Sequence, residues 1–449
     1  MSYNYLRTHS YTIGITSVII LLLIYSHLKT KILINVKQNG NNVEFEGFSN
    51  QVKKIVGKDD SIDNRENGGE NDDEVNDDKN DIDRTSDIIY NIRYYNTEYG
   101  NAYDDNYLNT MNAQNLISRE CSSMKQCRAK YSKSLLEINN SEAEGINILL
   151  NMIVRKLKSE GKEGNLLLRL SIIKLLVSGN VFIAKGNKWL ENGMPHTILN
   201  NIVLPAETWF NQISLLSKRC NGKQDCFHES ILLNEGSTLI HELTHIRQRY
   251  HESQLIYDTN HVNPYNNLYK LWGFIKSDYI DNIQDILEKN RHNPDGLDDK
   301  WIWKTNANNV DKYYWIGAIF NNHNPSSLRD VQYIAVELFK ISSQELHLTN
   351  DDIPKGAIEL PIEISNGNNA NNTNNIFKRL ESSSIIQLSS LREFNDYFGN
   401  VLGNNNYHPN EISAQYMEIY YKNKLNLGGK PNNEGYKHFV ENINGLLVY

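Results

Sequence analysis

The first feature in the pattern of apolar and polar residues is a long uncharged stretch near residue 8. From Thr8 to Leu28 the chain contains no Asp, Glu, Lys or Arg. A helix of about twenty such residues covers the ~30 Å core of a bilayer. We therefore expect a short tail over residues 1–10 and a single-pass transmembrane anchor over residues 11–28. A cleaved signal peptide is the alternative, although Tyr25–Leu28 is a poor small-residue cleavage site.

The next part is acidic and lacks apolar periodicity. Residues 58–84 contain twelve Asp and Glu but only four Lys and Arg, and their aliphatic side chains are two Ile and one Val. Such a segment cannot bury enough apolar surface to fold. We predict a juxtamembrane segment and disordered acidic linker over residues 29–87. Because residues 58–84 account for the whole net charge of -8, the rest of the chain has no excess charge that would attract nucleic acid.

From residue 88 to residue 449 the pattern is mainly helical. Apolar residues recur at helical spacing in four segments, Ile146–Leu157, Leu166–Leu176, Leu328–Leu348 and Glu411–Lys424. A short strand is expected at Val181–Ala184. The extended residues Met194–Pro205 are either the edge that pairs with a peptide substrate or an ordinary surface strand. We predict one α+β domain, mostly α with a small sheet.

This domain contains a His-Glu-x-x-His motif at His241, Glu242 and His245. Two His four residues apart lie on one face of a helix, close enough to bind one zinc ion. Glu242 lies beside them, where its carboxylate accepts a proton from a water on the metal. The opposite face is expected to pack in the core through Leu239, Leu243 and Ile246. The motif predicts Zn²⁺ as cofactor and Glu242 as general base.

A zinc site needs a third protein ligand and an open fourth position. Glu411 is the main candidate, because Pro409 and Asn410 mark a helix start and place Glu411 in the first turn. Gln415 follows one turn later, where it can orient a zinc-bound His. We predict that Glu411 completes the ligand set.

His251 is the alternative third ligand, because its spacing from His241 matches a longer zinc motif. That motif needs the helix to end at a glycine that turns the chain back, and this chain has Gln248 there. If the helix continues, His251 points away from the pair. Ligand chemistry alone also leaves open Glu252, Asp258 and His261.

The four cysteines form two local pairs of equal spacing, Cys121 with Cys127 and Cys220 with Cys226. Such pairs are typical of small disulfide loops in an oxidising compartment, and four free thiols are the alternative. The pairs favour a lumenal or extracellular side for the domain, whereas the lysines after the uncharged stretch favour the cytoplasm.

The motif at 241–245, together with Asn-Glu-Ile-Ser-Ala at 410–414, resembles the gluzincin-type, thermolysin-like zinc metallopeptidases. The resemblance implies that His241, His245 and Glu411 bind zinc and that Glu242 is the general base. Gln415 stands where thermolysin has an Asp. The stretches 240–249, 291–296 and 408–411 also resemble zincin-like proteins of large DNA viruses and protists.

Together, these features predict a membrane-anchored zinc metallopeptidase, an endopeptidase rather than an exopeptidase, acting on proteins or peptides. The alternative is a non-catalytic zinc-binding protein, or a membrane-tethered interaction protein with a degenerate zincin fold. Peptide hydrolysis also needs a hydrogen-bond donor to the transition-state oxyanion. The candidates in polar segments after the motif are Tyr313, Tyr314, His323 and His408.

Overall fold

A computed structural model describes the residues 90–94, 124–198, 200–221, 223, 226–250, 264–291, 301–307, 309–320, 331–341, 375–380, 383–399 and 407–447. All of them belong to one compact unit of the chain, residues 88–449. The predicted tail (1–10), anchor (11–28) and linker (29–87) lie outside the described residues and remain predictions. None of the described helices is long and apolar enough to cross a membrane.

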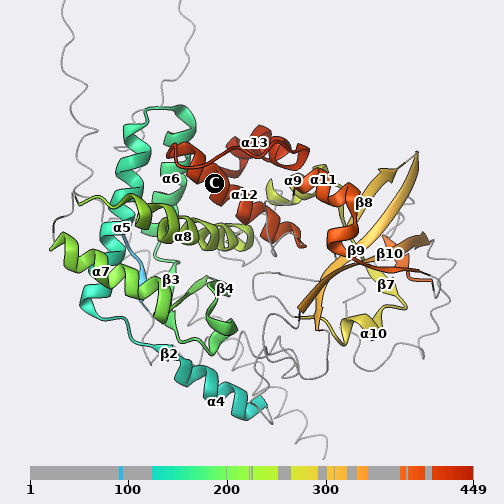
Figure 1. Cartoon of the computed structure of the whole chain (residues 1–449), viewed down its shortest axis with the longest axis horizontal. Helices are drawn as coiled ribbons and strands as arrows, with labels where there is room; N and C mark the ends of the chain where they lie inside the picture. Colours follow the sequence, from blue (N-terminus) through green and yellow to red (C-terminus); the bar gives the residue numbers. More distant parts are fainter. Residues whose placement is uncertain are drawn as a thin grey trace, which may run out of the picture. The chain divides into compact units, whose positions relative to one another are not determined.

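The described chain is a mixed α+β structure with mostly helical residues (Figure 1). Its helices are α4 (Met124–Ser134), α5 (Asn140–Ser159), α6 (Glu163–Val177), α7 (Asn211–Cys220), α8 (Glu229–Tyr250), α9 (Pro264–Leu271), α10 (Gln284–Leu287), α11 (Arg392–Phe398), α12 (Pro409–Lys424) and α13 (Glu434–Leu447). Shorter helical turns are η5 (Leu190–Gly193), η6 (Ala206–Phe210) and η8 (Leu388–Ser390). Helices α5, α6 and α12 confirm three of the four predicted helical segments.

The first sheet provides an edge strand next to α8. Its order is β1-β3-β5-β4, with β2 also paired to β3. The strands are β1 (Arg93–Tyr94), β2 (Leu135–Leu136), β3 (Phe182–Gly186), β4 (His196–Ile198) and β5 (Asn201–Pro205). β1, β3 and β5 run parallel, and β4 is antiparallel to β5. β4 is the last strand of this described order and contacts α8.

The second sheet is larger than the small sheet predicted. Its order is β6-β8-β9-β10-β11-β7, with β12 also paired to β10. The strands are β6 (Phe274–Lys276), β7 (Tyr279–Asp281), β8 (Trp301–Ala307), β9 (Val310–Phe320), β10 (Val331–Ile341), β11 (Ile376–Lys378) and β12 (Ile385–Gln387). The long antiparallel pair of β9 and β10 forms its centre.

The predicted helix over Leu328–Leu348 is wrong, because this segment contains strand β10. Ile334, Val336 and Leu338 are buried in one apolar cluster, while Ala335 is buried in another. The alternation is that of a strand covered on both faces. Such a strand has few polar positions, so its apolar run cannot be distinguished by periodicity from a buried helix.

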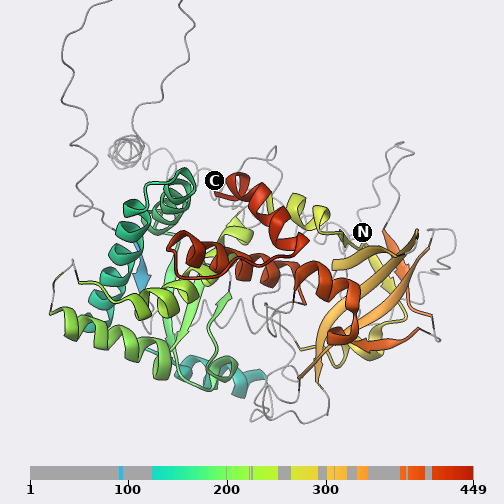
Figure 2. The ribbon, with the colours of Figure 1, turned by 45° about the horizontal axis from the view of Figure 1, so that its top comes forward.

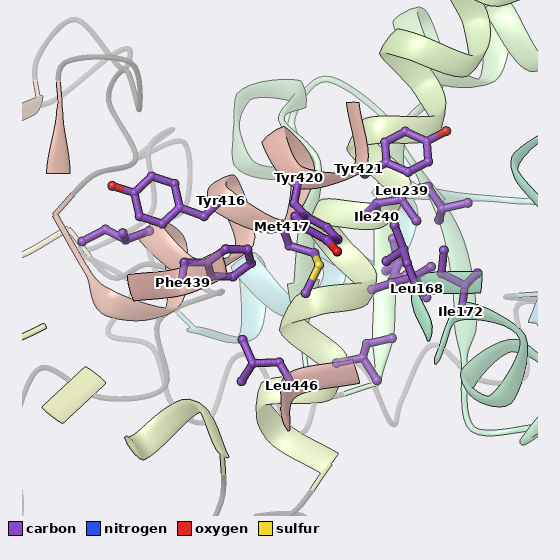
Figure 3. Packing of buried hydrophobic residues seen from close by; sticks show 14 of the residues in the cluster. Leu168, Ile172, Leu239, Ile240, Tyr416, Met417, Tyr420, Tyr421, Phe439 and Leu446 are labelled. Carbon is purple, nitrogen blue, oxygen red and sulfur yellow. The ribbon is translucent and has the colours of Figure 1, made fainter. Parts of the chain in front are cut away.

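Helices α8 and α12 lie side by side (Figures 1 and 2). The side chain of Tyr421 in α12 packs against α8 at Gly236. A Cβ atom at this position would lie only 2.9 Å from the Tyr421 hydroxyl, so the glycine allows the close approach. That hydroxyl donates to the Leu232 carbonyl oxygen of α8 at 3.1 Å. Figure 3 shows apolar side chains of α6, α8, α12 and α13 packed together, among them Leu168, Ile172, Leu239, Ile240, Met417, Tyr420, Phe439 and Leu446. This packing fixes the position of α8 relative to α12, and with it the position of the polar residues that the two helices carry outside the apolar cluster.

Candidate metal centre

The middle of α8 carries His241, Glu242 and His245, which are all buried. The Nε2 atoms of the two His lie 3.1 Å apart, as expected for residues four apart in a helix. The predicted core face is confirmed, because the structure buries Leu239, Leu243 and Ile246. The His side of α8 is not open to solvent either: the side chain of His245 is 0% exposed.

The start of α12 supplies the third group. His408 is the N-cap residue, and its Nδ1 accepts from the Asn410 backbone N–H at 3.2 Å. Pro409 occupies the first turn, where its missing N–H costs nothing and its φ suits a helix. Glu411 therefore lies in the first turn and is 2% exposed. His408, one of the four candidate oxyanion donors, thus caps the helix through its Nδ1.

One carboxylate oxygen of Glu411 completes a triangle with the two imidazoles. Its Oε2 atom lies 3.5 Å from His241 Nε2 and 3.7 Å from His245 Nε2. A tetrahedral zinc ion with bonds of about 2.0–2.1 Å holds its ligand atoms about 3.3–3.4 Å apart. The three atoms thus have the spacing that one metal ion of this size requires. We call these three residues the histidine–glutamate group.

Gln248 determines which nitrogen of His245 faces the triangle. Its Nε2 donates to the Asn410 carbonyl oxygen at 2.9 Å and to Ser413 Oγ at 2.8 Å. This network assigns the amide oxygen of Gln248 to the contact with His245 Nδ1 at 2.9 Å. Because an amide oxygen only accepts, His245 Nδ1 carries the hydrogen. The lone pair of His245 is therefore on Nε2, the atom that faces His241 and Glu411.

Glu418 of α12 holds the other imidazole. Its Oε2 lies 3.6 Å from His241 Nδ1 and accepts from Gln415 Nε2 at 2.9 Å. Its Oε1 accepts from Ser237 Oγ at 3.2 Å and from Lys422 Nζ. The orienting role expected of Gln415 thus belongs to Glu418, which Gln415 helps to hold.

The electrostatics of the group favour a cation. Burial alone would lower the pKa of His241, but hydrogen bonds to Glu411 and Glu418 and nearby carboxylate charge raise this pKa well above its usual value. Burial raises the pKa of Glu418, but His241 and Lys422 outweigh it and lower this pKa to about 2. Buried carboxylates that stay ionised around an imidazole create a site for positive charge, which a proton and a metal ion both satisfy.

Glu242 faces the edge strand of the first sheet. Thr197 of β4 donates from Oγ1 to Glu242 Oε2 at 2.7 Å, and both residues are buried. The predicted extended stretch Met194–Pro205 contains two strands. In the described strand order β5 lies inside the sheet and β4 lies at its end. The general-base candidate, which follows His241 in α8, thus contacts the last described strand of the first sheet.

Among the described residues, only His241, His245 and Glu411 form this group of potential ligands. The helix runs through Gln248 to Tyr250, so the turn that the His251 motif needs is absent from α8. The ring of Tyr313 packs on Phe377 and that of Tyr314 on Trp303, within the second sheet. Several candidates lie outside the described residues: His251, Glu252, Asp258, His261 and His323.

Glu418 and Tyr333 were missed from the sequence. Glu418 follows Glu411 by two helical turns, so their shared helix face was a usable signal. Tyr333, on β10, packs its ring 5.2 Å from that of Tyr407, at the entry to α12. Burial raises the pKa of Tyr333, Arg291 lowers it, and the charge of Glu411 raises it. The Tyr333 phenol therefore lies within electrostatic reach of the group, although nothing in the sequence pattern indicated this.

Comparisons with known proteins find no match for this chain among protein-family models, curated proteins or solved structures.

Proposed function

We propose that residues 88–449 form a zinc-dependent peptidase whose metal is held by His241, His245 and Glu411. The observation that carries the proposal is the triangle of their ligand atoms, buried next to a further carboxylate, Glu242. Two imidazoles and one carboxylate are the ligand set of zinc peptidases that leave a fourth position open. When bound, zinc supplies a Lewis acid that polarises a carbonyl and lowers the pKa of a water.

Glu242 is the residue that moves protons in this proposal. Its carboxylate accepts the proton of the attacking water and passes it to the amine that leaves. The hydroxyl of Thr197 donates to one carboxylate oxygen, which supports a fixed orientation of Glu242. The tautomer set by Gln248 keeps the Nε2 lone pair of His245 directed at the metal position.

Strand β4 is the proposed substrate-binding edge. An extended peptide can add to such an edge through main-chain hydrogen bonds, and side-chain pockets then give specificity. The contact of Thr197 with Glu242 means that a peptide along β4 would pass the general base. A peptide bound as a strand is held on both sides of the cleaved bond, which favours an endopeptidase and protein or peptide substrates.

Tyr333 is the proposed donor to the oxyanion of the transition state. Its phenol keeps its proton, since burial is the main influence on its pKa and raises it. Tyr333 is partly buried, and a neutral O–H that is held in place is an effective donor to developing negative charge. Its ring contact with Tyr407 connects it to the segment that leads into Glu411.

One observation favours a second candidate function. The three ligand residues are 7%, 0% and 2% exposed, which is also what a structural zinc site that joins α8 to α12 would show. In that case the protein would bind zinc without hydrolysing peptides. The same group would then stabilise the fold, because metal binding to the folded state alone adds to its stability.

Glu242→Gln in the full-length chain separates these functions. Zinc content is measured by mass spectrometry, and hydrolysis with a library of quenched fluorescent peptides. We expect about one zinc per chain in both proteins, and a loss of hydrolysis of at least about 100-fold in the variant, the contribution of a general base. Glu235→Gln, on the same helix, is the control and should retain both properties.

Each other outcome decides against part of the proposal. A zinc-loaded wild-type chain that cleaves no peptide in the library would favour the structural zinc site. Full hydrolysis by Glu242→Gln would remove Glu242 as general base. A chain that stays metal-free when supplied with zinc would overturn both candidate functions.

A further inference from the structure

A second group of potential ligands lies where α7 leads into α8. Cys220 is the last residue of α7 and is buried, and His228 directly precedes the first residue of α8. Cys226 lies between them in the sequence and forms a disulfide with Cys220, which confirms that predicted pair. The other predicted pair, Cys121 with Cys127, involves a residue outside the described ranges. The two sulfur atoms and one ring nitrogen of His228 all lie within 4.8 Å of one another.

The chemistry of this cysteine–histidine group (Cys220, Cys226 and His228) is that of a transition-metal site. Two thiolates and one imidazole are a common ligand combination for zinc, with Zn–S near 2.3 Å and Zn–N near 2.0–2.1 Å. Such bonds place ligand atoms about 3.3–3.8 Å apart. The present separations need only side-chain rotation once the sulfur–sulfur bond is broken. As long as the disulfide is intact, the sulfur atoms carry no negative charge and are poor ligands.

The backbone holds this group together independently of the disulfide. Asn221 adopts a left-handed conformation with φ of 46° and donates its N–H to the Ser217 carbonyl at 2.9 Å, which ends α7. Lys223 N–H then donates to the Cys220 carbonyl at 2.9 Å, and Cys226 N–H to that of Lys223 at 3.3 Å. These turns remain available after reduction, so the two cysteines stay close as thiols.

His228 is also fixed by its backbone. Its carbonyl oxygen accepts from the Leu232 N–H at 3.0 Å, the first turn of α8. The ring is half-buried rather than free in solvent. Because α7 and α8 contact one another, the position of His228 relative to Cys220 is set by helix packing.

We propose that the cysteine–histidine group is a redox-gated metal site, closed as a disulfide and able to bind zinc when reduced. A dithiol reductant supplies two electrons and two protons, breaks the Cys220–Cys226 bond and is itself oxidised to a disulfide. Zinc then displaces both thiol protons and takes the His228 lone pair, with water in the fourth position. The site does not depend on the proposed peptidase function.

The test uses the full-length protein with His241→Ala and His245→Ala, so that the histidine–glutamate group takes up no metal. Cobalt(II) replaces zinc as the probe, because thiolate ligation gives it a charge-transfer absorption. After treatment with a phosphine reductant and its removal without air, we expect about one cobalt ion per chain with this absorption. The oxidised protein should take up none.

The chain provides a matched control in its second cysteine pair of equal spacing. Replacing Cys220 and Cys226 by Ser should abolish the reduction-dependent cobalt uptake, whereas replacing Cys121 and Cys127 by Ser should preserve it. His228→Ala should weaken binding at least about 10-fold, and His438→Ala should not change it. Circular dichroism identifies variants that have lost their fold, and His228→Ala then provides the decisive comparison.

Three results would overturn the proposal. The first is a reduced protein, verified by alkylation of its thiols, that binds no cobalt. The second is uptake that disappears with Cys121 and Cys127 instead. The third is binding insensitive to His228→Ala, which would mean that the imidazole is not a ligand.

Discussion

The two ligand-rich groups both involve α8, yet they are assembled in opposite ways. The histidine–glutamate group joins the middle of α8 to the start of α12, a helix from a distant part of the sequence. The cysteine–histidine group comes from one short segment, and a covalent bond closes it. The first therefore depends on tertiary packing, and the second on local turns.

The difference shows in what surrounds each group. In the first, the buried charges of Glu411 and Glu418 require compensation, because desolvation of an unpaired carboxylate costs several kcal/mol. Ser237, Gln415 and Lys422 donate hydrogen bonds to the Glu418 carboxylate. Around the second group, the described residues contribute backbone turns, a disulfide and a half-buried histidine. The buried hydrogen-bond network keeps the side chains of the first group in fixed positions. The second group is held by local turns, so its disulfide can open or close without unfolding the core.

The largest expected effect comes from removing the distant ligand. Glu411→Ala should weaken zinc binding by more than about 100-fold, beyond the about 10- to 100-fold typical of outer-shell partners. Competition with a chromogenic chelator measures this loss. The reduction-dependent metal uptake of the cysteine–histidine group should be unaffected. Glu434→Ala changes an exposed glutamate of α13 and is the control, which should bind zinc as the wild type does. Unchanged zinc affinity in Glu411→Ala would remove Glu411 from the ligand set.

A smaller effect is expected for the proposed oxyanion donor. Tyr333→Phe should lower kcat about 100-fold, the typical contribution of one such donor, and leave zinc affinity unchanged. Steady-state kinetics with a cleaved peptide measures it. Tyr314→Phe alters a tyrosine on the neighbouring strand that packs on Trp303, and it should behave as wild type. A change in KM alone would indicate a role in binding and contradict the assignment.

The smallest effect concerns the tautomer of His245. Gln248→Leu removes the acceptor of the Nδ1 hydrogen and should weaken zinc binding about 10-fold, at the low end for an outer-shell partner. Gln248→Glu keeps an acceptor at this position and should bind zinc more tightly than the Leu variant. Chelator competition compares the two, with the exposed Gln284→Leu as control. Equal losses in both Gln248 variants would mean that Gln248 only supports the packing.

The parts of the site that could be predicted were those with local signals. The periodicity of α8 and the Pro409–Asn410 start of α12 are properties of short segments, so they indicated the three candidate ligand residues that the structure brings together. The residues that hold the ligands could not be assigned in this way. The contact of Gln248 with Asn410 depends on how two distant helices pack, and that of Thr197 with Glu242 on which strand lies at the sheet edge. Strand β10 was missed because burial on both faces hides its period.

The place of Glu411 in the chain has a consequence for biosynthesis. Translation delivers α8 long before α12, so a growing polypeptide displays both imidazoles without their carboxylate partner. A ribosome-bound intermediate of that length cannot complete the three-ligand set. A peptidase built in this order would lack its third ligand, and therefore its activity, until Glu411 had been translated.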